Sequence, residues 1–179
     1  MNKLLLKGKI IMLMMLTVMA ATSCDDDDDD VDIDPNRLTK ESFMQQAAAT
    51  DTFEIQTGEM ASQEAEMEEV REFGELLVMH HSMTSKQLKQ LAENENVTLP
   101  TALPQDKMAM KQELEGLDGM EFDQRFVEIQ IAAHEEAIAL YEEAIDDVDD
   151  AEVVTFAQNG LPLLRQHLQI AQELEQMME

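Results

Sequence analysis

The chain has 179 residues, which is enough for one domain that buries most of its apolar surface and too few for two comfortable ones. Aromatic residues make up only 4% and tryptophan is absent, while helix-favouring residues dominate and strand-like alternation is scarce, so the composition predicts an all-α protein. The formal net charge of −27 argues against a nucleic-acid partner, because no basic stripe exists to neutralise phosphates.

Residues 1–23 have the pattern of an export signal. Three lysines form a positive start, an apolar run at 10–19 is too short to span a bilayer, and small residues follow. The sequence Ala-Thr-Ser-Cys at 21–24 resembles a bacterial lipobox, whose cysteine is lipidated and becomes the mature N-terminus. Because Cys24 is the only cysteine, lipidation explains it better than redox chemistry does. The alternative is an ordinary signal cleaved near Ala20 that leaves the thiol free.

Residues 24–38 form an acidic tether. Six consecutive aspartates at 25–30, followed by two more, make a like-charge block that cannot fold on itself. Such a run directly after a lipidated cysteine resembles the surface-export signals of Bacteroidota lipoproteins, although a plain spacer explains it equally well. We therefore expect an outer-membrane lipoprotein of the cell envelope, either periplasmic or displayed at the cell surface, that meets the membrane through its lipid anchor.

Residues 39–179 are predicted to form one helical domain. Thr39 caps a helix that runs to about residue 65, and after a break near 66 a second long helix fades by residues 94–96. A loop punctuated by prolines at 99–104 leads to a short helix that Gly116 terminates.

Two further long helices complete the domain. Asp118 with Glu121 forms the pattern of a capping box and predicts a helix that runs to about residue 146. Asp149 with Glu152 has the same pattern and predicts the start of the last helix. A kink is expected in that helix at Pro162. Antiparallel packing is the economical way to bury four amphipathic stripes. The expected fold is therefore an all-α, antiparallel four-helix bundle with one short extra helix and a disordered acidic N-terminal tether.

Each long helix carries one ligand-capable residue on its otherwise apolar face. These residues are Glu54, His81, His134 and His167. All four lie near the middle of their helices, and mid-helix residues of an antiparallel bundle share one level whichever way each helix runs, so we expect the four side chains to converge. Three imidazoles and one carboxylate suit one Zn, Fe or Cu ion. The alternative is a buried polar cluster in which Glu54 pairs with one or two histidines and only fixes helix register.

Neighbouring residues limit the kind of site. His80 points about 100° away from His81 around the helix, so only His81 of the pair is expected to face inward. Di-iron bundles need Glu-x-x-His on two helices, and the residues three before the candidate histidines are Val78, Ile131 and Leu164, which argues against a ferritin-type oxidase centre. Met79 and Met83 flank the histidine pair and suit copper, but methionines are more often core filler.

Nothing in the sequence indicates a reaction. No nucleophile elbow, dinucleotide fingerprint or phosphate loop is present, and no substrate is suggested. Asp123 is interpreted as a first-turn anion stabilised by the dipole of its own helix. The second hypothesis is thus a structural or interaction lipoprotein whose acidic outer faces meet protein partners or envelope cations.

Several segments together resemble the DUF4142 family of exported bacterial proteins. They are residues 54–61, the segment ending at His81, the Leu99-Pro100 loop, Phe122-Asp123, His134 and residues 161–168. The resemblance covers about residues 41–174 and implies a ferritin-like helical bundle, usually periplasmic or a lipoprotein, of uncharacterised biochemical function. It also implies that the family pattern has an acidic residue at the position of Glu54 and a histidine at the positions of His81, His134 and His167. This chain has His80 and Ala133 where the family commonly has aspartate.

Overall fold

The computed structural model describes residues 37–179, which form five helices. They are α1 (Lys40–Glu64), α2 (Glu68–Asn94), α3 (Gln105–Leu114), α4 (Gly119–Asp147) and α5 (Ala151–Met178). The all-α fold class is confirmed, and the predicted helix ends agree to within a few residues. The expected signal, Cys24 and the tether up to residue 36 lie outside the described residues.

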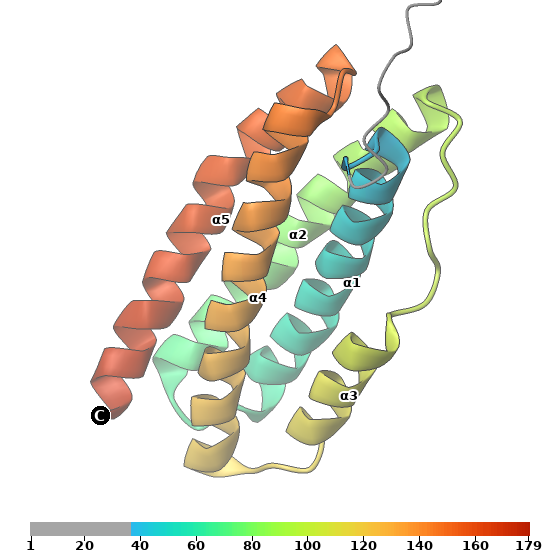
Figure 1. Cartoon of the computed structure of the whole chain (residues 1–179). Coiled ribbons are helices and arrows are strands. Elements are labelled where there is room, and N and C mark those ends of the chain that lie inside the picture. The colour runs from blue at the N-terminus through green and yellow to red at the C-terminus, as the bar shows by residue number, and fades with distance from the viewer. Residues whose placement is uncertain (1–36) are drawn as a thin grey trace, which may run out of the picture. The chain divides into compact units, whose positions relative to one another are not determined.

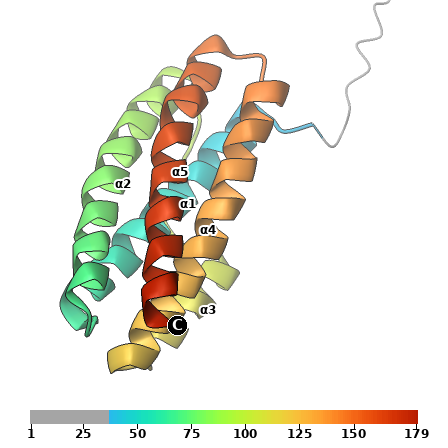
Figure 2. The same cartoon turned by 90° about the vertical axis from the view of Figure 1, so that its left-hand side faces the viewer.

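The four long helices pack as a bundle (Figures 1 and 2). α1 packs against α2 and α4, and α5 packs against the same two helices, so that neighbours run antiparallel. The connection at 95–118, which contains α3, returns the chain along the outside of the bundle, so α2 and α4 run in the same direction at diagonal positions. This arrangement matches helical bundles with one long crossover connection. Among the helices of residues 37–179, none combines the length and apolar character that a membrane crossing requires.

Helix capping is confirmed at α1 and differs at the later helices. The hydroxyl of Thr39 accepts a hydrogen bond from the backbone N–H of Ser42 at 3.1 Å, as expected for an N-cap. α5 is capped by Asp150 rather than Asp149, and Asp149 pairs with Arg37 at 2.9 Å. The helix therefore begins one residue later than the predicted box.

The capping box predicted for α4 is wrong. Asp118 is the N-cap residue, but its side chain makes no capping hydrogen bond. α5 continues through Pro162, and the kink expected there stays a prediction.

Asp123 connects α4 to the turn between α1 and α2. It is fully buried, and its two carboxylate oxygens accept hydrogen bonds from the backbone N–H groups of Glu66 at 3.0 Å and Met67 at 2.7 Å. These amides precede α2 and have no acceptor within a helix. The prediction that Asp123 serves the dipole of its own helix is therefore wrong, because this residue is one position past the first turn of α4 and faces another element.

The core consists of two apolar clusters stacked along the bundle axis. The first core includes Phe43, Met44, Leu88, Tyr141 and Val153. The second core includes Phe53, Phe73, Leu77, Phe126 and Leu174. Burying one large apolar side chain stabilises the fold by about 1.5–3 kcal/mol relative to exposure, so these clusters hold the helices together.

A layer of buried polar residues separates the two cores. Along every long helix, one buried residue with an ionisable side chain follows the last member of one core and precedes the first member of the other. These residues are Asp51 on α1, His81 on α2, His134 on α4 and His167 on α5. We call these four residues, together with the buried Glu54, the polar layer. The expectation that mid-helix residues share one level is confirmed for the three histidines.

Two glycines set the distance between α1 and α2 next to the polar layer. A Cβ added at Gly74 would lie 2.7 Å from the carbonyl oxygen of Gly58 and 2.9 Å from the Cβ of Ala61. A Cβ added at Gly58 would lie 2.8 Å from the carbonyl oxygen of Gly74. The two backbones thus touch where only glycine fits.

We expect Gly74→Ala to lower the free energy of unfolding by about 1–3 kcal/mol, because the obstructing atoms belong largely to backbone that must shift. Chemical denaturation of the metal-free protein measures the effect. Gly116→Ala is the matched control, since its added Cβ would meet its nearest atom, the carbonyl oxygen of Glu113, at an ordinary 3.5 Å. An equal effect of the two substitutions would contradict the close helix contact.

Candidate metal centre

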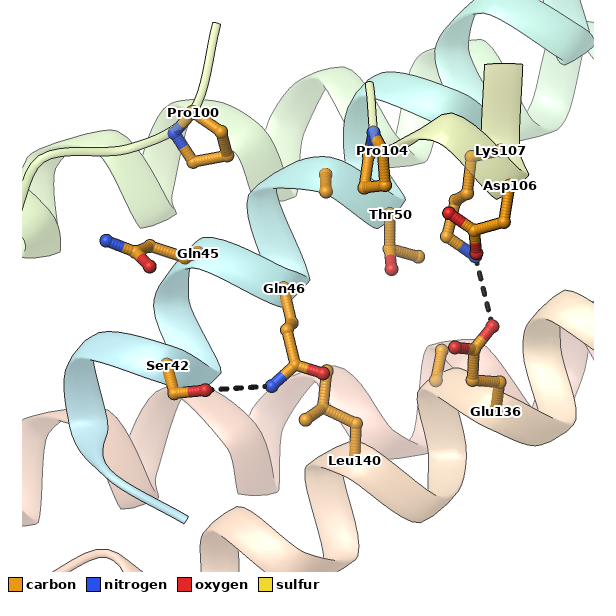
Figure 3. A pocket seen from close by; sticks show the side chains of 12 residues that line it. Ser42, Gln45, Gln46, Thr50, Pro100, Pro104, Asp106, Lys107, Glu136 and Leu140 are labelled. Carbon is orange, nitrogen blue, oxygen red and sulfur yellow. Dashed lines mark hydrogen bonds and ion pairs between the residues drawn. The ribbon is translucent and has the colours of Figure 1, made fainter. Parts of the chain in front are cut away.

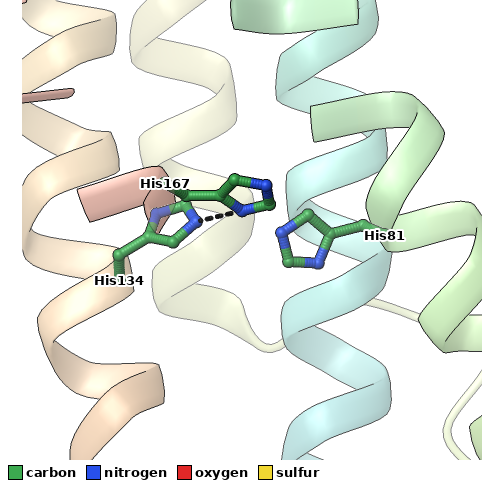
Figure 4. A group of neighbouring side chains, drawn as sticks. All are labelled: His81, His134 and His167. Atoms are coloured by element: carbon green, nitrogen blue, oxygen red, sulfur yellow. Dashed lines mark hydrogen bonds between the residues drawn. The ribbon is translucent and has the colours of Figure 1, made fainter. Parts of the chain in front are cut away.

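Three histidines from three helices meet in the polar layer (Figure 4). His81, His134 and His167 are all buried, and one ring nitrogen of each lies within 4.8 Å of those of the other two. A tetrahedral ion that binds imidazole nitrogens at about 2.0–2.1 Å separates them by about 3.4 Å. Binding of such an ion would therefore require the ring nitrogens to move closer together than 4.8 Å. The predicted convergence of the three rings is therefore confirmed, while their role as ligands stays a prediction.

His81 is oriented by a carboxylate that sequence analysis missed. Its Nδ1 lies 2.8 Å from Oδ1 of the buried Asp51, which also accepts a hydrogen bond from the hydroxyl of Thr84 at 2.9 Å. Burial raises the pKa of Asp51. Burial opposes the charged form of His81, but the hydrogen bond to Asp51 and the field of Glu54 outweigh it and raise the pKa of this imidazole.

The other nitrogen of His81 has no partner. Nε2 is buried and makes no hydrogen bond to the described residues. Since Nδ1 is engaged by Asp51, Nε2 is the nitrogen that Figure 4 shows on the side of the ring facing the other two histidines. Leaving a buried polar atom unpaired costs about 1–3 kcal/mol, so this atom is poised for a ligand that the chain itself does not supply.

A chain of hydrogen bonds fixes which nitrogens carry protons on the remaining rings. His134 Nδ1 lies 2.8 Å from the carbonyl oxygen of Gln130, which can only accept, so Nδ1 carries the proton and Nε2 holds the lone pair. His134 Nε2 therefore accepts from Nδ1 of His167 at 3.2 Å. His167 Nε2 in turn accepts from Nδ1 of His80 at 2.9 Å. Burial lowers the pKa of His134 to about 3 and that of His167 to about 2, so both rings are neutral at pH 7.

His80 contacts the site from outside the bundle core. As predicted, only His81 of the pair is buried, but Nδ1 of His80 lies 2.9 Å from Nε2 of His167. The ring of His80 is half-buried and stacks on that of His167 with centroids 5.2 Å apart and planes 13° from parallel. The periodicity of α2 places His80 away from the bundle axis but beside α5, and the imidazole is long enough to reach His167 from there. Burial, followed by the charge on His81, lowers the pKa of His80.

Glu54 is buried but does not pair with the histidines. Both carboxylate oxygens lack a hydrogen-bond partner among the described residues, and Glu54 is not in the group whose ligand atoms lie within 4.8 Å. The expectation that it pairs with a histidine is therefore corrected, since Asp51 fills that role. Burial raises the pKa of Glu54 to about 7. Its part as a ligand stays a prediction.

A cavity bordered by α1, α3 and α4 is lined in part by the buried Lys107 (Figure 3). The cavity has a volume of about 380 Å³ and is lined by residues that include Thr50, Lys107 and Glu136. Lys107 Nζ donates to Glu136 at 3.0 Å and lies 5.2 Å from the centre of the Phe53 ring. The positive charge of Lys107 contributes to lowering the pKa of His134, after burial and His81.

Comparison with known proteins places the chain in a family. The model described as "Domain of unknown function (DUF4142)" matches residues 32–174. The chain belongs to the DUF4142 family. The resemblance noted from its sequence segments is thus confirmed. The comparison of this DUF4142 chain with curated proteins found no match.

Solved structures share the fold of this DUF4142 chain. CopM in its Cu(II)-bound form is 17% identical, with a TM-score of 0.69 over 80% of this chain and 99% of that one. CopM in its Ag-bound form is 18% identical, with a TM-score of 0.65 over 78% and 97%. A putative secreted DUF305 protein from Streptomyces coelicolor is 10% identical, with a TM-score of 0.67 over 78% and 94%. At these identities the likeness concerns the fold alone.

Proposed function

We propose that this DUF4142 protein is a lipid-anchored envelope protein that binds one transition metal ion through His81, His134 and His167. The single observation that carries the proposal is the meeting of three buried imidazoles, one of them with an unpartnered Nε2. Zn(II), Fe(II) and Cu(II) all accept imidazole ligands. The Cu(II)-bound and Ag-bound forms of CopM, which has the same fold, favour copper among them.

The hydrogen bonds around the three rings suit metal ligands. His81 and His134 each offer Nε2, while Nδ1 is held by Asp51 and by the Gln130 carbonyl. Ligating histidines usually donate their second N–H to a carboxylate or backbone carbonyl in this way, which fixes the ring orientation. The third ligand atom is Nδ1 of His167. As a neutral ligand this ring would carry its proton on Nε2, which would then donate to Nδ1 of His80.

The buried charges suit a divalent ion. Asp51 and Glu54 are both acidic and lie in the polar layer, where an uncompensated negative charge is costly. With neutral imidazoles as ligands, the two carboxylates together balance the two positive charges of the ion. The ion would thus offset the energetic cost of burying the charge of Glu54 while it binds the free Nε2 of His81.

A structural role is the second candidate, and the hydrogen bonds from His80 through His167 to His134 favour it, because they form without any ion. In that role the layer only fixes helix register. It predicts that His81→Leu combined with Glu54→Gln leaves stability unchanged or raises it, with no metal bound by the parent protein. The unpartnered atoms of His81 and Glu54 argue against this role, since register-fixing clusters satisfy their polar groups.

Stoichiometry tests the proposed metal site. We expect the untagged mature protein, dialysed against buffered Cu(II) or Zn(II), to retain about one equivalent by elemental analysis. Less than about a tenth of an equivalent of each metal tested, both as isolated and after reconstitution, would overturn the proposal.

The lipid anchor at Cys24 places this site in the cell envelope, attached to the outer membrane. Support comes from the lipobox-like sequence and the acidic run that follows it. We expect Cys24→Ser to move the protein from the membrane fraction to the soluble fraction of expressing bacteria, as detected by immunoblotting. Retention of the variant in the membrane fraction would contradict lipidation at this residue.

A further inference from the structure

The outer face of α2 next to the polar layer carries two exposed thioethers. Met79 is 52% exposed and Met83 is 56% exposed. Residues four apart lie one above the other on a helix, with Cβ atoms about 5–6 Å apart. His80 follows Met79 directly and precedes Met83 by three residues, so all three side chains leave the helix within an arc of about 100°.

His80 presents a free lone pair at this position. The hydrogen-bond chain that starts at the Gln130 carbonyl requires Nδ1 of His80 to donate to His167, which leaves Nε2 of His80 without a proton in the neutral ring. No described residue makes a hydrogen bond to this Nε2. The ring is half-buried and contacts His167 through Nδ1, so Nε2 is the nitrogen that this contact leaves free.

We propose that Met79, Met83 and Nε2 of His80 form an outer site for a soft monovalent ion, Cu(I) or Ag(I). Thioethers are soft ligands that bind such ions well and bind hard divalent cations poorly. The strongly acidic chain attracts cations in general, and the two sulfur atoms select among them. The outer site shares no ligand with the proposed buried centre. The two sites are coupled through the hydrogen bond between His80 and His167, so the lone pair on Nε2 of His80 belongs to the protein without an ion at His167.

Other exposed methionines provide an internal comparison. Met108, Met120 and Met177 are 43%, 37% and 55% exposed. None of them has a histidine within one helical turn in the sequence. If exposure alone allowed a thioether to bind soft ions, these residues would respond as Met79 and Met83 do.

Methyl NMR of the full mature chain in detergent micelles tests the outer site. The methionines carry a ¹³C-labelled ε-methyl group, and AgNO₃ is added in chloride-free buffer. We expect the Met79 and Met83 signals to shift together and saturate at about one equivalent of Ag(I), with little change at Met108, Met120 and Met177. Equal shifts at all exposed methionines, or no shift at the pair, would overturn the proposal.

Variants separate this site from the buried centre. His81→Leu removes a proposed ligand of the buried centre that takes no part in the hydrogen bonds from Gln130 to His80, and in the metal-free protein it is expected to leave the Ag(I) response of Met79 and Met83 in place. His80→Gln is expected to weaken that response about tenfold or more, because the imidazole donor is lost. The double substitution Met79→Leu and Met83→Leu should abolish one Ag(I) equivalent while Zn(II) uptake continues. An unchanged response in His80→Gln would exclude the histidine and contradict the proposed ligand set.

Discussion

Replacing His134 with leucine is expected to weaken metal binding at least about 100-fold, because the ion loses one of three imidazole ligands. Leucine is close in size to histidine and fits between the two apolar cores, so the bundle should still fold. The substitution destabilises the fold by removing the hydrogen bonds to the Gln130 carbonyl and to His167. It also stabilises the fold, because a polar ring no longer has to be buried. These effects oppose each other, and we expect the stability of the metal-free protein to change by about 1 kcal/mol. Competition titration with a chromophoric chelator measures the affinity.

Tyr141→Phe provides the matched control for this substitution. Tyr141 lies on the same helix, seven residues beyond His134, and is buried in the first core rather than in the polar layer. We expect Phe at this position to leave metal affinity unchanged. If His134→Leu bound metal as tightly as this control, the ion would have to sit elsewhere and the three-histidine site would be disproved.

Replacing Glu54 with glutamine is expected to stabilise the metal-free protein at pH 8 and to have a much smaller effect at pH 4.5. Burial raises the pKa of Glu54 from 4.5 to about 7 in the folded protein. Between these two values the folded state holds a proton that the unfolded state has released, so stability is fully present below about pH 4.5 and is lost as the pH rises through about 7. The shift corresponds to a loss of about 3 kcal/mol, which the neutral amide avoids.

Chemical denaturation of both proteins at several pH values, with chelator present, measures this difference. We expect the stability gain of Glu54→Gln to grow by about 3 kcal/mol between pH 4.5 and pH 8. Glu59→Gln, at an exposed position of the same helix, is the control and should show a gain that stays constant with pH. A constant gain for Glu54→Gln would contradict the burial of an uncompensated carboxyl group.

The sequence predicted the helices and the level of the three histidines well. Apolar stripes at spacings of three and four fix which face of each helix is buried, and antiparallel packing brings the helix centres to one height. His81, His134 and His167 each interrupt such a stripe near its middle. Their convergence therefore followed from periodicity alone, without knowledge of side-chain geometry.

The partners of the histidines could not be predicted in this way. Asp51 and Glu54 are three residues apart and share a face of α1, so helical periodicity predicts that both face inward. The packed structure then shows that it is Asp51, the shorter side chain, that forms the hydrogen bond with His81. His80 lies off the axis of the bundle, and its contact with His167 depends on how closely α5 approaches α2. The only feature of the sequence that could have indicated this contact is that His80 is the direct neighbour of His81.

Tertiary contacts also determined the partners of two acidic residues for which local helix-capping rules gave the wrong prediction. Asp123 reads locally as a helix-start anion, yet it bonds to amides of the turn between α1 and α2. Asp149 has the sequence position expected of an N-cap, but it pairs with Arg37, and Asp150 is the residue that caps α5. In each case the sequence identified the right kind of group, an acceptor near a helix end, and the fold selected its partner.

Anomalous diffraction from crystals of the metal-loaded protein, recorded at the absorption edge of the bound metal, tests the central claim most directly. We expect a single strong peak in the polar layer at about 2.0–2.1 Å from Nε2 of His81, Nε2 of His134 and Nδ1 of His167. A loaded crystal with no peak between these rings, or with the peak bound by other residues, would contradict the account.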